Sequence, residues 1–282
     1  MNKLKYLIDS KEVYTSIQGS PKFNFGKDEI LSTEDTDITF HQPWYDEGYS
    51  VAPLLNEEEF ENLKENLNLS VKNIIEKELS INTKNFTLEK YHQYVKDDDS
   101  HFKVVSKTRD LFEDDFIFST SYLINRLSDL FGFKLTDKIP QSKDKLHIIV
   151  RINRPLSYDS NPPHKDIYEV VDDLSFIPKF ANFWIPISGV TDKTSLPLAS
   201  QSHKINEKNI CRTFKGGVME GNQYRVRMIK SWNGSNSLTR SNVTYGQVLM
   251  FSSHLIHGLA LNEEKDITRV ALEFRLFKED DV

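Results

Sequence analysis

Helical patterns fill the first half of the chain and strand patterns the second, and this order limits the folds that the chain can adopt. After about residue 140, short runs rich in β-branched and aromatic residues alternate with Gly and Pro turn signals, as strands do. Helices followed by strands are typical of an α+β chain whose β part is a sandwich or a barrel. The expected strands are 147–153, 183–187, 243–251 and 269–277.

Three helices are expected before residue 140: at 56–75, from Thr87 to about Val95, and from about Phe116 to Leu130. At the first, Glu59 follows Asn56 by three residues, which is close to a capping box, and apolar residues then recur at helical spacing. The second is not extended further, because the acidic residues 97–99 would lie at its negative C-terminal end. The third should stop at Gly132, since glycine tolerates a left-handed C-cap.

With 282 residues, the chain is long enough for a single large domain, 1–282, with an N-terminal extension. Residues 1–55 mix short apolar runs with glycine and acidic residues, and we expect a loosely ordered arm with a strand or two. Residues 56–140 would form a helical support, and residues 141–282 the β core.

Composition and charge exclude several classes of protein. A net charge of −6 argues against a broad nucleic-acid surface and against binding to a bare anionic membrane. The single cysteine, Cys211, rules out an internal disulfide framework and a cysteine-based zinc cage. The sequence shows no secretory signal and no run of about eighteen apolar residues, so we expect a cytoplasmic protein without a membrane span.

The strongest functional signal is Asn161-Pro-Pro-His164-Lys-Asp166 together with His257. On a strand, residues i and i+2 point to the same face, so His164 and Asp166 could converge on one metal ion. Two histidines and one carboxylate on one side of a metal leave its other side open, as in non-haem iron(II) oxygenases. A lone His-x-Asp pair is more often a surface or capping feature, whereas the complete set is far rarer. His254 falls on the opposite strand face from His257 and is not taken as a ligand.

An arginine follows this group on the last expected strand. Arg269 lies twelve residues after His257, and its planar guanidinium could bind a carboxylate through two hydrogen bonds. Arg275 lies six residues further along, on the same strand face, and is the alternative partner. We prefer Arg269.

Several motifs occur in the order found in one enzyme family. They are Arg151-Ile-Asn153-Arg-Pro155, Pro163-His164-Lys-Asp166, Asn182-Phe-Trp184-Ile-Pro-Ile187 and His257-Gly258 with Asn262 and Arg269. Over about residues 146–277 the chain resembles the phytanoyl-CoA hydroxylase-like family of iron(II)/2-oxoglutarate-dependent dioxygenases, which includes ectoine hydroxylase. Two departures are visible: Ser200-Gln201 stands where the family has Pro-Gly, and one extra residue separates His257 from Arg269.

The resemblance implies an α+β fold with a mainly β core, a double-stranded β-helix (a cupin-like jelly roll) flanked by N-terminal helices. It implies iron(II) held by His164, Asp166 and His257, with 2-oxoglutarate and O2 as co-substrates. The reaction would be hydroxylation of an unactivated C–H bond of a small-molecule substrate, with release of succinate and CO2.

The resemblance also implies roles for other residues of the core. It would put Asn153 near 2-oxoglutarate and Arg151 near the substrate. Apart from the resemblance, Trp184 is a further candidate for a contact with 2-oxoglutarate and Arg275 for a contact with the substrate. The alternative for Arg151 is a structural strand with a surface arginine, and for Trp184 it is core packing alone.

The family inserts loops over the active-site mouth where this chain has residues 205–240. Five basic residues lie there between positions 212 and 230: Arg212, Lys215, Arg225, Arg227 and Lys230. A flexible basic lid would attract an anionic substrate. A solvated charged hairpin is the other interpretation.

Three functions therefore compete. They are a 2-oxoglutarate-dependent hydroxylase, a metal enzyme of the same barrel that does not use 2-oxoglutarate, and a non-catalytic small-molecule-binding module. Arg269 argues against the second, because a buried arginine needs an anionic partner, and the complete His-Asp-His set argues against the third. Halogenation is disfavoured, because resembling halogenases have Gly or Ala where this chain has Asp166. The sequence identifies neither the substrate nor the oligomeric state.

Overall fold

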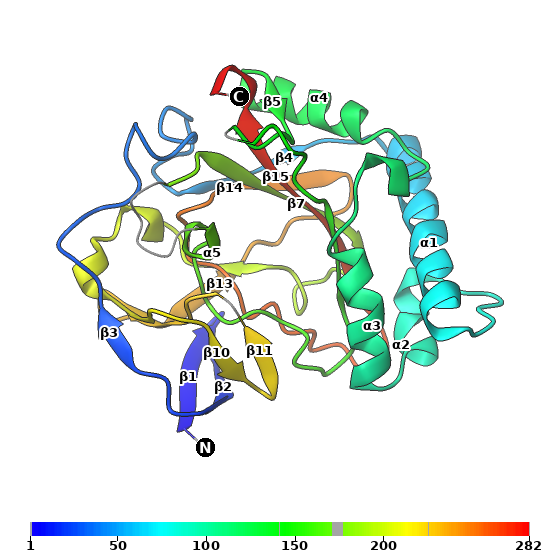
Figure 1. Cartoon of the computed structure of the whole chain (residues 1–282), viewed down its shortest axis with the longest axis horizontal. Helices are drawn as coiled ribbons and strands as arrows, with labels where there is room; N and C mark the ends of the chain where they lie inside the picture. Colours follow the sequence, from blue (N-terminus) through cyan, green and yellow to red (C-terminus); the bar gives the residue numbers. More distant parts are fainter. Residues whose placement is uncertain (1, 141, 171–176, 225, 282) are drawn as a thin grey trace.

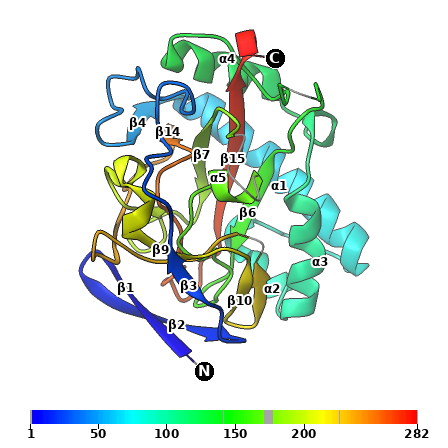
Figure 2. The same cartoon turned by 60° about the vertical axis from the view of Figure 1, so that its left-hand side comes forward.

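The computed structural model describes residues 2–140, 142–170, 177–224 and 226–281. Its largest feature is an antiparallel sheet, here called the large sheet, in the order β4-β14-β7-β15-β5, with β6 also paired to β15 (Figures 1 and 2). The strands are β4 (Tyr49–Pro53), β5 (Leu135–Thr136), β6 (Ile149–Asn153), β7 (Phe180–Ser188), β14 (Gln247–Ser252) and β15 (Arg269–Lys278). β6, β7, β14 and β15 are the four strands that the sequence predicts.

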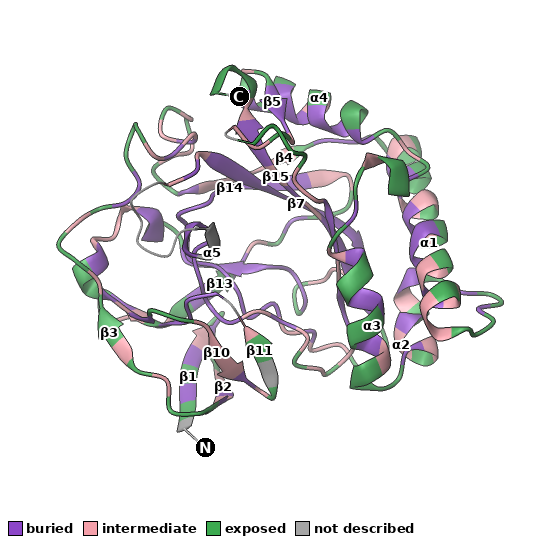
Figure 3. Cartoon of the chain, viewed as in Figure 1, coloured by how far each residue is buried: buried purple, intermediate pink, exposed green. Residues whose placement is uncertain are grey.

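Helices cover one face of this sheet: α1 (Glu57–Leu79), α2 (Tyr91–Tyr94), α3 (Asp98–Thr108) and α4 (Thr120–Phe131). Asn56 and Glu59 form the predicted capping box at the start of α1, and Gly132, with φ 83°, ends α4 as predicted. Figure 3 shows these helices buried on the side that faces the sheet and exposed on the other. In the described parts of the chain, no helix is long and apolar enough to cross a lipid bilayer.

The sequence does not predict α3. Its N-cap is Asp97, whose carboxylate accepts a hydrogen bond from the backbone N–H of Ser100. The acidic residues 97–99 therefore begin a helix after the short α2 has ended, and their charge favours the positive N-terminal end. The helical pattern is weak because the buried face of α3 holds only His101, Val104, Val105 and Thr108.

The two faces of the large sheet carry different side chains, because successive strand residues point to opposite sides. The face toward the helices is apolar and joins the main hydrophobic core; its members include Phe183, Ile185, Ile187, Val270, Leu272 and Phe274. The opposite face lines a cavity with the intervening residues Asn182, Trp184, Arg269, Glu273 and Arg275. The helices thus stabilise one side of the sheet and leave the other side for polar groups.

A second wall closes the cavity from the other side. It contains β8 (Pro197–Leu198) and β13 (Ser237–Arg240), and continues through β1 (Asn2–Ile8), β2 (Lys11–Gln18), β10 (Gly217–Met219) and β11 (Asn222–Tyr224). Single bridges join Leu198 to His257 and His257 to His164. Trp184 of the large sheet packs in one apolar cluster with Leu198 and Leu255 of this wall, so the walls are face to face.

A small third sheet supports the second wall from the side. Its order is β12 (Ile229–Trp232), β9 (Ile210–Thr213) and β3 (Phe23–Phe25). The backbone N–H of Ile229 donates to the carbonyl of Pro163 over 2.8 Å, which ties this sheet to the segment that carries His164.

The prediction of a loosely ordered N-terminal arm is wrong. Within the described residues 2–55, β1 pairs with β13, β2 with β10, β3 with β9 and β4 with β14. In β1, the buried residues Leu4, Tyr6 and Ile8 alternate with exposed Lys3 and Lys5. That alternation is visible in the sequence, but the partner strands lie far along the chain.

Residues 205–240 agree with neither interpretation of their basic residues. They carry β9 to β13, and Arg212 and Arg227 are buried. The guanidinium of Arg212 lies 4.5 Å from the ring centre of Tyr168 and 4.4 Å from that of Phe214. Lys215 and Lys230 are exposed, and Arg225 lies outside the described residues. Part of the basic stretch is therefore packed structure.

Candidate functional site

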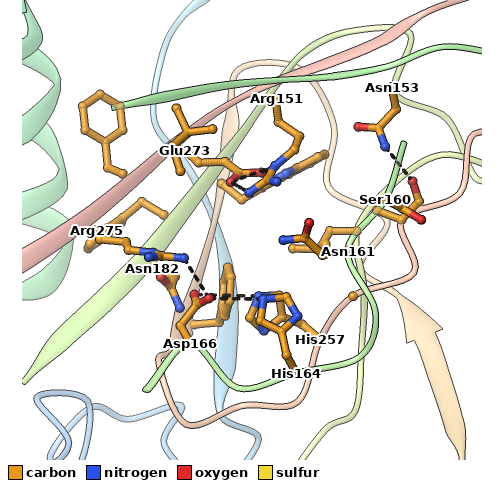
Figure 4. A pocket seen from close by; sticks show the side chains of 18 of the residues that line it. Arg151, Asn153, Ser160, Asn161, His164, Asp166, Asn182, His257, Glu273 and Arg275 are labelled. Carbon is orange, nitrogen blue, oxygen red and sulfur yellow. Dashed lines mark hydrogen bonds and ion pairs between the residues drawn. The ribbon is translucent and has the colours of Figure 1, made fainter. Parts of the chain in front are cut away.

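Three side chains that could hold a metal ion meet at the second wall: His164, Asp166 and His257 (Figure 4). Their ligand atoms all lie within 4.8 Å of one another. Oδ1 of Asp166 is 3.3 Å from Nε2 of His164, and Oδ2 is 3.7 Å from Nε2 of His257. All three residues are buried. The structure thus brings together the group that the sequence pattern singles out.

The backbone here is not the continuous strand that the i, i+2 argument assumes. His164 forms a single antiparallel bridge with His257, and Asp166 lies in the turn that leads into α5 (Ile167–Val170). The bridge is closed by hydrogen bonds of 2.9 Å and 3.1 Å between the two backbones. The turn brings Asp166 toward both imidazoles, as a strand would have done.

The close approach of two backbone segments explains why a glycine, Gly258, follows His257. Its φ is 137°, and a Cβ at this position would lie 2.5 Å from the carbonyl oxygen of Pro162. A larger residue would separate the two segments that carry the histidines.

Both imidazoles present Nε2 to the centre of the group. Nδ1 of His164 lies 2.7 Å from the carbonyl oxygen of Pro162, and Nδ1 of His257 lies 3.0 Å from that of Leu255. A carbonyl only accepts, so each Nδ1 carries a proton, and in a neutral ring Nε2 is then the atom with a lone pair for a metal. Burial, together with the neighbouring His164, lowers the pKa of His257 to about 4, so the His257 ring is neutral near pH 7.

Arg275 contacts the candidate ligand Asp166 directly. Its Nη2 donates to Oδ1 over 2.9 Å. Although burial raises the pKa of Asp166, Arg275 and the two imidazoles hold it well below its usual range, so the carboxylate is ionised. The sequence left Arg275 as a candidate for 2-oxoglutarate or substrate. The structure instead gives it a partner that is itself a candidate metal ligand.

Arg269 is almost fully buried in the same cavity and has donors to spare. Its Nη2 donates to Oδ1 of Asn153 over 2.6 Å and to the carbonyl of Ala260 over 3.3 Å. Its Nε and Nη1 have no hydrogen-bond partner in the described structure. Burial lowers the pKa of Arg269 to about 9, although the nearby carboxylate of Glu273 acts in the opposite direction. The guanidinium therefore stays charged near pH 7. A buried cation with unused donors calls for an anionic ligand.

Asn153 and Trp184, the two residues predicted to contact 2-oxoglutarate, both lie against Arg269. The amide of Asn153 donates to the carbonyl of Asp159 over 2.6 Å, which turns its Oδ1 toward Arg269. The Trp184 ring lies 5.6 Å from the guanidinium carbon, and its indole N–H is unpaired within the described residues. Trp184 therefore packs in the core and also offers a donor to the cavity.

Arg151 lines the cavity but is paired with Glu273. Its Nε donates to both carboxylate oxygens, at 3.0 and 3.2 Å, and its Nη2 donates to Oε2 at 2.7 Å. The surface-arginine alternative is therefore wrong, because Arg151 lines the cavity wall. Whether it contacts a substrate stays a prediction.

The cavity between the walls holds about 620 Å³ of space not filled by protein atoms, including the part that is open to solvent. The polar residues of its lining that the sequence reasoning did not assign to the site include Asn182 and Glu273. The alternation of strand side chains between two faces could have indicated both. Asn182 shares a strand face with Trp184, and Glu273 shares one with Arg269 and Arg275.

A buried charge network holds the metal-ligand segment from behind. Lys165, between His164 and Asp166 in the sequence, is completely buried and its Nζ lies 2.9 Å from Oε1 of Glu207. Oε2 of Glu207 accepts hydrogen bonds from Tyr168 at 2.6 Å and from Nε of Arg212 at 3.1 Å. Burial raises the pKa of Glu207, but Lys165 and the other partners of Glu207 lower it by more. The pKa is therefore below its ordinary value, and the carboxylate is ionised. One carboxylate thus compensates two buried cations.

We predict that Glu207→Gln lowers the free energy of unfolding by about 3–5 kcal/mol, because it leaves Lys165 and Arg212 buried without a counter-charge. Urea denaturation of parent and variant measures the change. The control is Glu12→Gln, which breaks the exposed ion pair with Lys5 and should alter stability little. Equal stability of Glu207→Gln and the parent would show that the network contributes nothing net.

No protein-family model matches the sequence, and no curated protein sequence matches it either. Solved structures with a similar fold include a non-heme monooxygenase, the ThoJ–Ni complex (12% identity, 86% of this chain and 77% of that chain, TM-score 0.46). EctD from S. alaskensis, with 2-oxoglutarate and 5-hydroxyectoine, has 11% identity over 95% and 87% of the two chains (TM-score 0.46). AviO1 from Streptomyces viridochromogenes has 11% identity over 89% and 97% (TM-score 0.45). At these values the likenesses carry no inference about what this chain binds.

Proposed function

We propose that this chain is an iron(II)- and 2-oxoglutarate-dependent dioxygenase that hydroxylates an unactivated C–H bond of a small molecule. The observation that carries the proposal is the content of one cavity. A buried His-Asp-His group lies on one wall, and a buried arginine with unused donors lies among the residues of the other.

The metal would be held by His164, Asp166 and His257. Two neutral imidazoles and a carboxylate suit iron(II) and leave its remaining positions open for ligands. All three come from the second wall and the turn after it, so the open side would look toward β7 and β15. The hydrogen bonds on both Nδ1 atoms and the Arg275 contact with Asp166 would fix the ligands before the metal arrives.

The side chains facing that open side suit a ligand that accepts hydrogen bonds. Unpaired buried nitrogen atoms of the cavity lining, within the described residues, are Nε and Nη1 of Arg269, Nε1 of Trp184 and Nδ2 of Asn182. All of them donate. A dicarboxylate such as 2-oxoglutarate offers only acceptors, and its distal carboxylate could accept a charge-assisted hydrogen bond from an unpaired nitrogen of Arg269.

When bound, iron(II) would activate O2, which is the oxidant. Two of the four electrons that O2 accepts would come from the decarboxylation of 2-oxoglutarate to succinate and CO2, and two from the C–H bond that gains one oxygen atom. The chain's own residues would bind and orient the metal and 2-oxoglutarate and shield them from water.

The order of the strands also supports a double-stranded β-helix. Strands β6, β7, β14 and β15 lie in the large sheet, and the segments that follow β6, β7 and β14 run in the second wall.

The proposal is tested by succinate formation from 2-oxoglutarate with iron(II) and O2, against a panel of amino-acid, sugar-nucleotide and acyl-carrier substrates. We expect one member of the panel to raise the rate and to gain one oxygen atom, as mass spectrometry would show. Product formation that does not need 2-oxoglutarate would instead favour a different metal enzyme. Metal binding without any turnover would favour a binding module.

We predict that the chain binds one equivalent of iron(II) and that His164→Ala or His257→Ala abolishes this, because each removes a ligand that nothing nearby replaces. Anaerobic calorimetry measures the binding. The matched control is His254→Ala, since His254 precedes His257 by three residues but binds the carbonyl of Thr36. Iron binding by both ligand variants at the parent's affinity would contradict the assignment.

We also predict that 2-oxoglutarate binding depends on Arg269 far more than on Arg275. Removing one partner of a buried charge pair costs on the order of 2–5 kcal/mol, so Arg269→Ala should weaken binding roughly a hundredfold. Arg275→Ala removes a neighbour of Asp166 and should affect metal affinity first. Dissociation constants for metal and for 2-oxoglutarate, measured separately, distinguish the two. An equal loss of 2-oxoglutarate affinity in Arg275→Ala would transfer the role to that residue.

A further inference from the structure

Asn182 is a buried amide of the cavity wall that no interaction within the protein explains. It lies on β7 with 4% of its surface exposed. Its Nδ2 makes no hydrogen bond within the described residues. An unpaired buried donor is costly, and native structures keep few of them without a reason. A ligand that enters the cavity is one such reason.

The strand register fixes where Asn182 lies. Its neighbours across the sheet are Arg275 on β15 and Phe251 on β14. Arg275 donates a hydrogen bond to Asp166. The ring of Phe251 packs edge-on against that of His257, with the two ring centres 4.9 Å apart. Both neighbours of Asn182 therefore touch a candidate metal ligand. Figure 4 shows Asn182, Arg275 and Asp166 on the same side of the cavity.

The donors of the large sheet form a row with Asn182 at one end. Trp184 lies two residues further along β7, about 7 Å away, and Arg269 lies beyond it, with its guanidinium carbon 5.6 Å from the indole ring. A five-carbon diacid with its distal carboxylate on Arg269 would extend along this row toward the His-Asp-His group. Its other carboxylate would then arrive beside Asn182.

We infer that Asn182 binds the metal-chelating carboxylate of 2-oxoglutarate, by donating an amide hydrogen bond to one of its oxygens. The inference rests on the proposed function. A neutral donor suits this place, since Arg275 already balances the charge of Asp166. Different residues would thus bind the two ends of the co-substrate: Arg269 the distal carboxylate and Asn182 the chelating carboxylate.

Two 2-oxo acids separate these ends experimentally. 2-Oxopentanoate has the same five-carbon chain as 2-oxoglutarate and keeps the chelating end, but it lacks the distal carboxylate. Dissociation constants for both acids are measured by calorimetry on the Ni(II)-loaded protein, which binds without turning over. The variants are Asn182→Leu, Asn182→Asp and Arg269→Ala.

We expect Asn182→Leu to weaken both acids by about tenfold, the effect of losing one hydrogen bond to a charged acceptor. Asn182→Asp keeps the shape, loses the donor and adds a like charge, so it should weaken both at least as much. Arg269→Ala should weaken 2-oxoglutarate alone. A loss confined to 2-oxoglutarate in the Asn182 variants, or no loss, would overturn the inference.

The matched control is Asn161→Asp, which adds the same charge to the same cavity from the loop before His164. It should weaken the acids less than Asn182→Asp, and an equal loss would mean that general repulsion, and not the position of Asn182, is responsible. Ni(II) affinity and thermal unfolding of each variant show that the site and the fold persist. If the parent protein does not bind 2-oxoglutarate, the proposed function is contradicted as well. This measurement comes before any variant is compared.

Discussion

The register of β15 against β7 is the constraint on which the rest of the structure depends. It pairs Glu273 with Trp184 and Arg275 with Asn182, so that polar residues of both strands share the cavity face. A slip by one residue would turn charged side chains into the helical core and apolar ones into the cavity. The register shifts between Val270 and Ala271, opposite Pro186. A proline has no N–H for the ladder, and such an irregularity accommodates it within a central strand.

Charge then fixes the segment that carries the candidate metal ligands, from both sides. Inside the cavity, Arg275 holds the carboxylate of Asp166. Behind the wall, Lys165 points away from its two neighbours and is held by Glu207. Because Glu207 also binds Arg212 of β9, the packed part of the insertion supports the ligand geometry. The segment therefore has little freedom to move its ligands independently of the surrounding structure.

Local patterns predicted much of this, and long-range pairing limited the rest. The capping box at Asn56, the C-cap at Gly132 and the strands of the large sheet follow from spacing within a short stretch of sequence. So does the convergence of His164 and Asp166, although a turn replaces the expected strand. His257 lies far along the chain, and the residue types of the complete set joined it to the other two. Lys and Glu are normally exposed, so nothing in the sequence distinguishes Lys165 and Glu207 as a buried pair. The strands of residues 2–53 likewise depend on partners far along the chain.

Ligand binding and stability are coupled at Arg269. In the protein alone, its charge is buried and two of its nitrogen atoms have no partner within the described residues, which costs free energy. A ligand that binds only the folded chain adds stability in proportion to RT ln(1 + [L]/Kd), or about 2.7 kcal/mol at a hundred times Kd. Much of that gain would be the recovery of hydrogen bonds that Arg269, Trp184 and Asn182 lack without it. A ligand with acceptors at only one end would recover fewer of them, so under the proposed function the wall that destabilises the empty cavity would also select a diacid.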